Sequence, residues 1–200
     1  DRTEEYLEDV VDRIYIALKN LGDFVNRHYP ELRTDLPNEI KYITSQELED
    51  MYPDLNPEER ENEIAKKERA VFISKIGGNL KSGKPHDGRA PDYDDWELNG
   101  DIILWNDILE SAYEISSMGI RVDEESMKKQ LEISGKKDRE NLDFHKKILN
   151  RELPYTVGGG IGQSRLCMYF LRKAHIGEVQ VSVWPNEMIK KCEESDIFLL

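Results

Sequence analysis

The sequence has few cysteines and no long apolar run. Cys167 and Cys192 are its two cysteines among 200 residues, and neither belongs to a Cys-x-x-Cys pair. We therefore expect no structural zinc site, and two free thiols in a reducing cytoplasm. No stretch approaches the roughly 20 apolar residues that span a bilayer, and no basic and apolar leader opens the chain. We expect no membrane as a partner.

Basic residues are also scarce relative to acidic ones. The chain has 28 Lys and Arg against 41 Asp and Glu, which gives a formal net charge of −13. Such a surface repels a polyanion, so we expect no nucleic acid as a partner. A local group of arginines at a phosphate site stays open, because net charge does not describe a pocket.

The apolar pattern predicts helices interspersed with short strands. Thr3, Asn56 and Asp123 are expected N-caps, the second followed by Pro and by Glu at the capping-box position. Further helices are expected from a cap at Ser45, from 138 to about 151 and from 163 to about 172. Strands are expected at 39–43, 70–76, 101–105, 113–117 and 179–184, with a long loop at 77–91.

This order of elements indicates the fold class. Strands and helices do not alternate regularly, and a polar turn joins 101–105 to 113–117 as an antiparallel pair. We therefore expect an α+β fold with a mainly antiparallel sheet flanked by helices. Residues 1–200 are enough for one domain with its own core.

A glycine-rich segment is the most informative part of the sequence. Residues 158–162 read Gly-Gly-Gly-Ile-Gly, and a helix with Arg165 in its first turn follows. Glycines permit a sharp turn and close approach of a ligand. Gln163 stands where a P-loop needs Lys, and no strand-helix-strand unit supports a Rossmann fingerprint. A nucleotide site and a plain turn with a surface arginine both remain open.

Two acidic residues could meet on neighbouring strands. Asp101 opens one expected strand and Glu114 lies on the next, so antiparallel pairing can place both on one sheet face. Two close carboxylates repel each other unless a cation joins them, and Mg²⁺ bound to ATP phosphates would suit. The alternative is two solvated acids.

A family resemblance covers nearly the whole chain. Gly-Gly-Gly-Ile-Gly-Gln-Ser-Arg-Leu at 158–166 resembles the third signature of class II aminoacyl-tRNA synthetases. Arg-Ala-Pro-Asp-Tyr-Asp-Asp-Trp at 89–96 and Ser-Ser-Met-Gly-Ile-Arg-Val at 116–122 resemble the ammonia-dependent asparagine synthetases, a free-standing relative of those enzymes. The same holds for residues 45–48, 52–55, 100–102, 153–157, 175–180 and 183–185.

The resemblance implies a class II synthetase-like catalytic fold and a reaction. ATP would activate L-aspartate as a β-aspartyl adenylate, and ammonia would convert it into L-asparagine with release of AMP and pyrophosphate. The implied partners are aspartate, ammonia and ATP with Mg²⁺, and the implied assembly is a homodimer.

The resemblance also implies roles for individual residues. Asp101 and Glu114 would hold Mg²⁺, with Ser117, Gly162 and Arg165 at the nucleotide. Arg121 would bind the side-chain carboxylate of aspartate, Asp94 its α-ammonium, and Arg89 a carboxylate or a phosphate. The catalytic set would be Arg165, Arg121 and Asp94. Arg121 in a structural ion pair and Ser117 as a buried strand serine are the alternatives, and His86 and Asp87 are expected to be loop polar residues.

Two departures from the family pattern bear on these expectations. The family's amino-terminal portion, with the second signature, is missing, so we expect residues 1–200 to be the carboxyl-terminal portion of a longer catalytic domain. Residues 96–101 are shorter than in the family, as a deletion or a mobile loop. An aspartyl- or asparaginyl-tRNA synthetase core and a truncated non-catalytic nucleotide-binding paralogue are the rival functions. The role of the amphipathic tail at 186–200 stays open.

Overall fold

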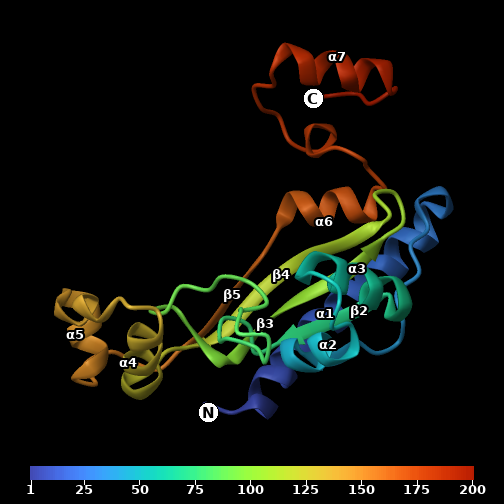
Figure 1. Ribbon diagram of the computed structural model, residues 1–200. Coiled ribbons are helices and arrows are strands. Elements are labelled where there is room, and N and C mark those ends of the chain that lie inside the picture. The colour runs from blue at the N-terminus through green and yellow to red at the C-terminus, as the bar shows by residue number, and fades with distance from the viewer.

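A five-stranded sheet forms the centre of the computed structural model, which describes all residues from 1 to 200 (Figure 1). The strands follow chain order across the sheet. The first two are parallel, and the other three neighbouring pairs are antiparallel. The predicted α+β class with a mainly antiparallel sheet is therefore confirmed. The strands are β1 (Lys41–Thr44), β2 (Ala70–Ser74), β3 (Asp94–Asn106), β4 (Ser111–Arg121) and β5 (Val157–Ile161).

Seven α-helices surround the sheet or extend from it. They are α1 (Glu4–His28), α2 (Ser45–Met51), α3 (Pro57–Glu68), α4 (Glu124–Ile133), α5 (Asp143–Leu149), α6 (Gln163–Phe170) and α7 (Asn186–Glu194). Three single 3₁₀ turns complete the structure: η1 (Pro30–Leu32), η2 (Lys137–Asn141) and η3 (Ile176–Glu178). No helix combines the length and the apolar character that crossing a membrane requires.

Local capping chemistry fixes most helix starts. The side chains of Thr3, Asn56 and Asp123 cap α1, α3 and α4, as predicted. The predicted cap at Ser45 is wrong by one residue. Thr44 caps α2 in a capping box with Glu47, while Ser45 is buried and its hydroxyl donates to the carbonyl of Lys75 at 2.6 Å.

The two faces of the sheet have separate cores. On one face, α1 and the end of α6 pack against Phe72, Ile102 and Leu104. On the other face, α2 and α3 pack against Val71, Ile73 and Ile103. The alternation of these neighbours along β2 and β3 is the two-residue period of a strand. We call the second face the α2/α3 face.

Three sequence predictions of secondary structure are wrong, and the first is a single helix at 138–151. The expected helix from 138 to 151 is divided into η2 and α5 at Leu142, whose backbone is extended. Arg139 and His145, on either side of this break, both bond to the Asp92 carboxylate at 2.8 and 2.9 Å. The two contacts with Asp92 therefore lie on either side of the break between η2 and α5.

The glycine-rich segment is an edge strand and not a turn. Its glycines pair with β4, with Gly158 opposite Gly119 and Gly160 opposite Ser117. The expected strand at 179–184 does not form. Val181 and Val183 are 75% and 96% exposed, and the segment leads to α7, which stands away from the sheet (Figure 1). Branched residues there have no neighbouring strand to pair with.

The short stretch at 96–101 lies inside β3, which begins already at Asp94. Both cysteines are free thiols, Cys167 exposed and Cys192 buried, as expected.

Candidate active site

Asp101, Glu114 and Ser117 lie together on the α2/α3 face because β4 contains a bulge. Asp101 pairs with Ser117, whereas Ile103 pairs with Glu114, so Ile115 is an extra residue in β4. Without a bulge, residues three apart on a strand point to opposite faces. The extra residue turns Glu114 and Ser117 to the same face as Asp101.

Asp101 is a buried carboxyl group between β2 and β4, with 5% of its surface exposed. Its Oδ2 accepts a hydrogen bond from Arg89, and its Oδ1 is buried without a partner. Burial raises the pKa of Asp101 to about 6, against the opposing effects of the Arg89 charge and the Ser117 hydroxyl. An unpartnered oxygen on a buried acid leaves room for one more ligand or donor.

Glu114 and Arg165 form the exposed end of the arrangement. Nη1 of Arg165 donates to Oε1 of Glu114 at 3.0 Å and to its carbonyl oxygen at 3.1 Å. Gly162 joins β5 to α6, and a Cβ there would lie 3.3 Å from Arg165 Cβ and Cδ. The structure therefore brings Arg165 directly against one of the two predicted metal ligands.

A cleft of about 240 Å³ contains Asp101 and Glu114 together with residues of α3 and of the 77–91 loop. His86, expected to be a loop polar residue, is buried at this cleft. Its Nε2 bonds to Glu61 at 2.9 Å, and its Nδ1 has no partner. No sequence signal distinguishes this histidine from an exposed one, because its burial depends on where the loop folds back.

Asp94 and Arg121 form a second pair at the far end of β4. Their side chains make an ion pair, and they are cross-strand neighbours. Burial raises the pKa of Asp94 above its ordinary value, although the Arg121 charge opposes this shift. The Arg121 guanidinium lies 3.8 Å above the ring of Tyr93 and donates to the hydroxyl of Tyr93 at 3.0 Å.

Two glycines make room for this pair. A Cβ on Gly119 would lie 2.7 Å from Cγ of Asp94, and one on Gly158 would lie 2.5 Å from Nη2 of Arg121. Both distances are shorter than van der Waals contact allows. The glycine-rich pattern predicted a turn at Gly158, and no sequence signal indicated that either glycine lies beside the pair.

The predicted residues therefore lie in a row rather than in one cluster. Arg165 with Glu114 stands at one end, Asp101 with Ser117 and Arg89 in the middle, and Arg121 with Asp94 at the other end. At roughly 3.3 Å per residue, Glu114 and Arg121 are about 20 Å apart along the strand. The two arginine–acid pairs make no direct contact with each other.

The carboxylates fit the magnesium ion that the family resemblance implies. Mg²⁺ in nucleotide sites is usually held by one or two carboxylates plus phosphates and water. Asp101 and Glu114 supply two, and the unpartnered Oδ1 of Asp101 points to a missing neighbour. No group of three or more His, Cys, Asp or Glu side chains is arranged to hold a metal, so the phosphates and water would have to complete the coordination.

Solved structures with a similar fold are aminoacyl-tRNA synthetases. Aspartyl-tRNA synthetase from Entamoeba histolytica matches with a TM-score of 0.61 and 17% identity, over 90% of this chain and 40% of that one. Asparaginyl-tRNA synthetase from the same organism, in complex with asparaginyl-adenylate, matches with a TM-score of 0.54 and 18% identity, over 88% of this chain and 42% of that one. These likenesses show the class II synthetase fold.

Sequence relatives identify the family. The aspartate–ammonia ligase from Clostridium tetani is 60% identical over 200 residues, which are 100% of this chain and 59% of the relative. The aspartate–ammonia ligase from Limosilactobacillus reuteri is 61% identical over 201 residues, 100% of this chain and 60% of the relative. The chain thus spans about 60% of the length of these relatives. The aspartate–ammonia ligase family model matches residues 1–196, and the chain belongs to this family.

Proposed function

We propose that residues 1–200 are the carboxyl-terminal part of the catalytic domain of a ligase that makes L-asparagine from L-aspartate, ammonia and ATP. The names of its relatives support this activity. The observation that carries the proposal is the row on the α2/α3 face, where two arginine–acid pairs flank the buried Asp101.

Aspartate would bind at the Asp94–Arg121 end. The substrate has a cationic ammonium and an anionic side chain, so it can exchange charges with both members of the pair. The planar Arg121 guanidinium suits the side-chain carboxylate, because it can donate two parallel hydrogen bonds. Asp94 would accept from the α-ammonium. Arg89, next to Asp101, would meet a carboxylate or a phosphate.

ATP would bind at the opposite end of the row. Asp101 and Glu114 would hold magnesium, which when bound lowers the repulsion between the triphosphate and an attacking carboxylate. Arg165 would lie against the adenine and the phosphates, since a guanidinium can both stack and carry charge. Ser117 and Gly162 would line the nucleotide.

The proposed reaction proceeds in two substitutions. A β-carboxylate oxygen of aspartate attacks the α-phosphorus of ATP, and the bond to pyrophosphate breaks. Ammonia then attacks the β-carbonyl carbon of the adenylate. The carbon–oxygen bond to AMP breaks, and the nitrogen loses a proton. The protein's part is to align the reacting groups and to offset charge on the phosphates.

The test is AMP formation from L-aspartate, ATP and Mg²⁺ with the full native polypeptide. We expect AMP and asparagine with ammonium and neither with glutamine as the nitrogen source. Charging of tRNA with aspartate or asparagine would instead identify a synthetase, and nucleotide binding without AMP formation would identify a non-catalytic paralogue. We also expect a cytoplasmic homodimer without nucleic acid, to be checked by light scattering of the purified protein.

A further inference from the structure

The β3–β4 ladder is interrupted next to the proposed aspartate site. Asp94 pairs with Arg121, but the next paired residues are Asn99 and Gly119. Four residues, 95–98, therefore stand opposite the single residue Ile120. The ladder therefore holds Asp94 against Arg121 from one side only, through the hydrogen bond from the amide of Val122 to the carbonyl of Tyr93, and not from the side of the gap.

Two buried amide side chains replace the ladder on the β3 side. Oε1 of Gln130 accepts from the backbone N–H of Trp96 at 2.8 Å, and its Nε2 donates to the carbonyl of Asp94 at 3.0 Å. Nδ2 of Asn99 donates to the carbonyl of Asp95 at 2.9 Å. Gln130 and Asn99 are 3% and 1% exposed, so they hold this segment of β3 from within the protein.

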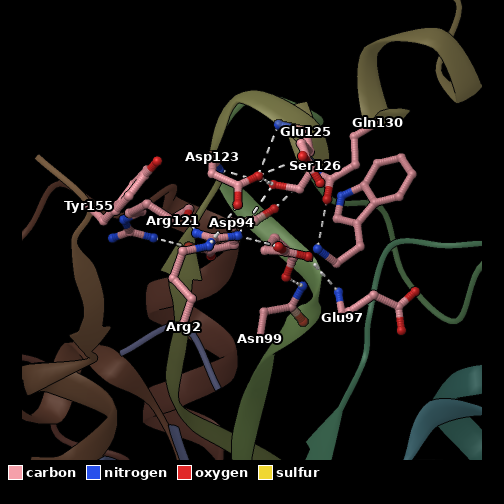
Figure 2. Close-up of polar contacts among 12 residues, drawn as sticks. Arg2, Asp94, Glu97, Asn99, Arg121, Asp123, Glu125, Ser126, Gln130 and Tyr155 are labelled. Atoms are coloured by element: carbon pink, nitrogen blue, oxygen red, sulfur yellow. Dashed lines mark hydrogen bonds and ion pairs between the residues drawn. The ribbon is translucent and has the colours of Figure 1, made fainter. Parts of the chain in front are cut away.

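Arg2 connects this segment to β4 (Figure 2). Its Nη2 bonds to Oδ2 of Asp95 at 2.6 Å, and its Nη1 donates to the backbone carbonyl of Arg121. Its Nε makes an ion pair with Oδ2 of Asp123 at 2.9 Å, and its side chain is 18% exposed. A single guanidinium thus contacts the residue after Asp94, Arg121 itself and the cap of α4.

We propose that Arg2 is a positioning residue for the aspartate site. It touches neither carboxylate nor guanidinium of the Asp94–Arg121 pair, and it acts by fixing the separation of the two strand ends that carry them. Without substrate, the side chains of Asp94 and Arg121 attract each other, and aspartate must enter between their charged groups. An anchor behind each partner fixes the two backbones, so that only the side chains have to move apart when the substrate binds. This inference rests on the proposed function.

The residue type suits this work. The guanidinium has donors pointing in several directions in one rigid plane, and three of them are used on three different acceptors. A lysine ammonium at the same place is a point charge on a flexible stem and cannot keep all three contacts. We therefore expect Arg2→Lys to restore only part of the effect of Arg2.

The test compares Arg2→Gln with Arg13→Gln in the full native polypeptide. Arg13 also carries an ion pair, with Asp9, but its side chain is 75% exposed and its partner lies on α1 itself, not on β3 or β4. In Arg2→Gln we expect the KM for aspartate to rise by about tenfold or more, because small displacements at a reacting centre are costly. The KM for ATP should stay within about twofold, and Arg13→Gln should change neither.

Hydrogen exchange supplies a readout independent of catalysis. The amide of Val122 bonds to the carbonyl of Tyr93 at 3.0 Å across the interrupted ladder, so exchange in 93–98 and 121–124 should be faster in Arg2→Gln and unchanged in Arg13→Gln. If Arg2→Gln does not fold, Arg2→Lys and Asp95→Asn take its place in both measurements.

Two results would overturn the inference. One is an unchanged KM for aspartate in a folded Arg2 variant. The other is an equal rise of both KM values together with a lower melting temperature, which indicates general destabilisation. Wild-type protein that makes no asparagine would refute the proposed function instead. The exchange comparison would still show whether Arg2 holds the two strand ends together.

Discussion

At the scale of single residues, the buried acids give the site raised pKa values, which can be measured. Asp94 and Asp101 are both almost fully buried, and each has an arginine partner. Burial nevertheless outweighs the arginine in both, so each pKa is raised. Groups with shifted pKa values gather at functional sites, and both acids belong to the row of residues proposed above as the site.

The raised pKa of Asp101 predicts a pH dependence of stability. The folded-state pKa of about 6 exceeds the ordinary value of 3.8, so the native state binds more protons than the unfolded state between these values. Stability must then fall as pH rises through this window and stay lower above it. Between pH 4.5 and pH 8, wild type should lose about 1–2 kcal/mol more stability than Asp101→Asn.

Urea unfolding at both pH values measures this difference. Parallel stability changes in wild type and Asp101→Asn would show that Asp101 does not titrate in this range. Comparing the change with pH, rather than the stability at one pH, removes the separate cost of leaving Arg89 without its carboxylate partner.

Arg165→Ala tests the nucleotide end of the row. If the guanidinium contributes about 3 kcal/mol to the adenylation step, the rate of AMP formation should fall at least about 100-fold. Arg13→Ala is the matched control, since Arg13 is on the exposed side of α1. An Arg165→Ala variant with a nearly normal rate would exclude this residue from the catalytic set.

At the scale of elements, β5 shows where sequence reasoning fails. Four glycines in five positions suggested a turn, yet three of them are paired strand residues. Position 158 requires glycine because Arg121 of the neighbouring strand occupies the space that a side chain would need. The reason for the glycine is therefore a contact between residues 37 apart in the chain, which no local pattern contains. By contrast, the caps at Asn56 and Asp123 were predictable, because their partners lie within three residues.

Gly158→Ala should disturb the aspartate end without disturbing the strand. The added methyl group would meet the Arg121 guanidinium at 2.5 Å, so the arginine must move. We expect the KM for aspartate to rise about tenfold or more. Gly160→Ala is the control, because a Cβ there has no atom within 4 Å, and it should leave the KM for aspartate unchanged. Equal effects of the two substitutions would contradict the proposed place of Arg121.

At the scale of the whole molecule, the fold class and the family were predictable and the arrangement of the site was only partly so. The order of strands and helices and the strings such as 89–96 identify the class II synthetase fold. The row of site residues depends on a bulge, a folded-back loop and an interrupted ladder. Each of these is set by tertiary packing, and the burial of His86 illustrates why it could not be expected.

The segment after η3 should be the first place that a protease cuts in this chain. Val181 and Val183 are strongly exposed and belong to no helix or strand, and exposed irregular segments are the preferred sites of cleavage. Brief treatment with elastase, followed by mass spectrometry, should give a fragment that ends near these residues. Earlier cleavage within 1–170 would show that this segment is better protected than its exposure indicates.

The extra residue Ile115 has a consequence for evolution of the site. It interrupts the two-residue alternation of β4, so that Glu114 and Ser117 lie on one face although they are three residues apart. Removal of this residue would leave a regular ladder in which Glu114 keeps its face, because Ile102 already pairs with Ser116 and Ile103 with Glu114. If Ile115 instead paired with Ile103, Glu114 would turn toward the apolar interior against α1. Such a slip in register would separate the two acids while changing no charge, so evolution of the site has to retain the bulge as well as the side chains.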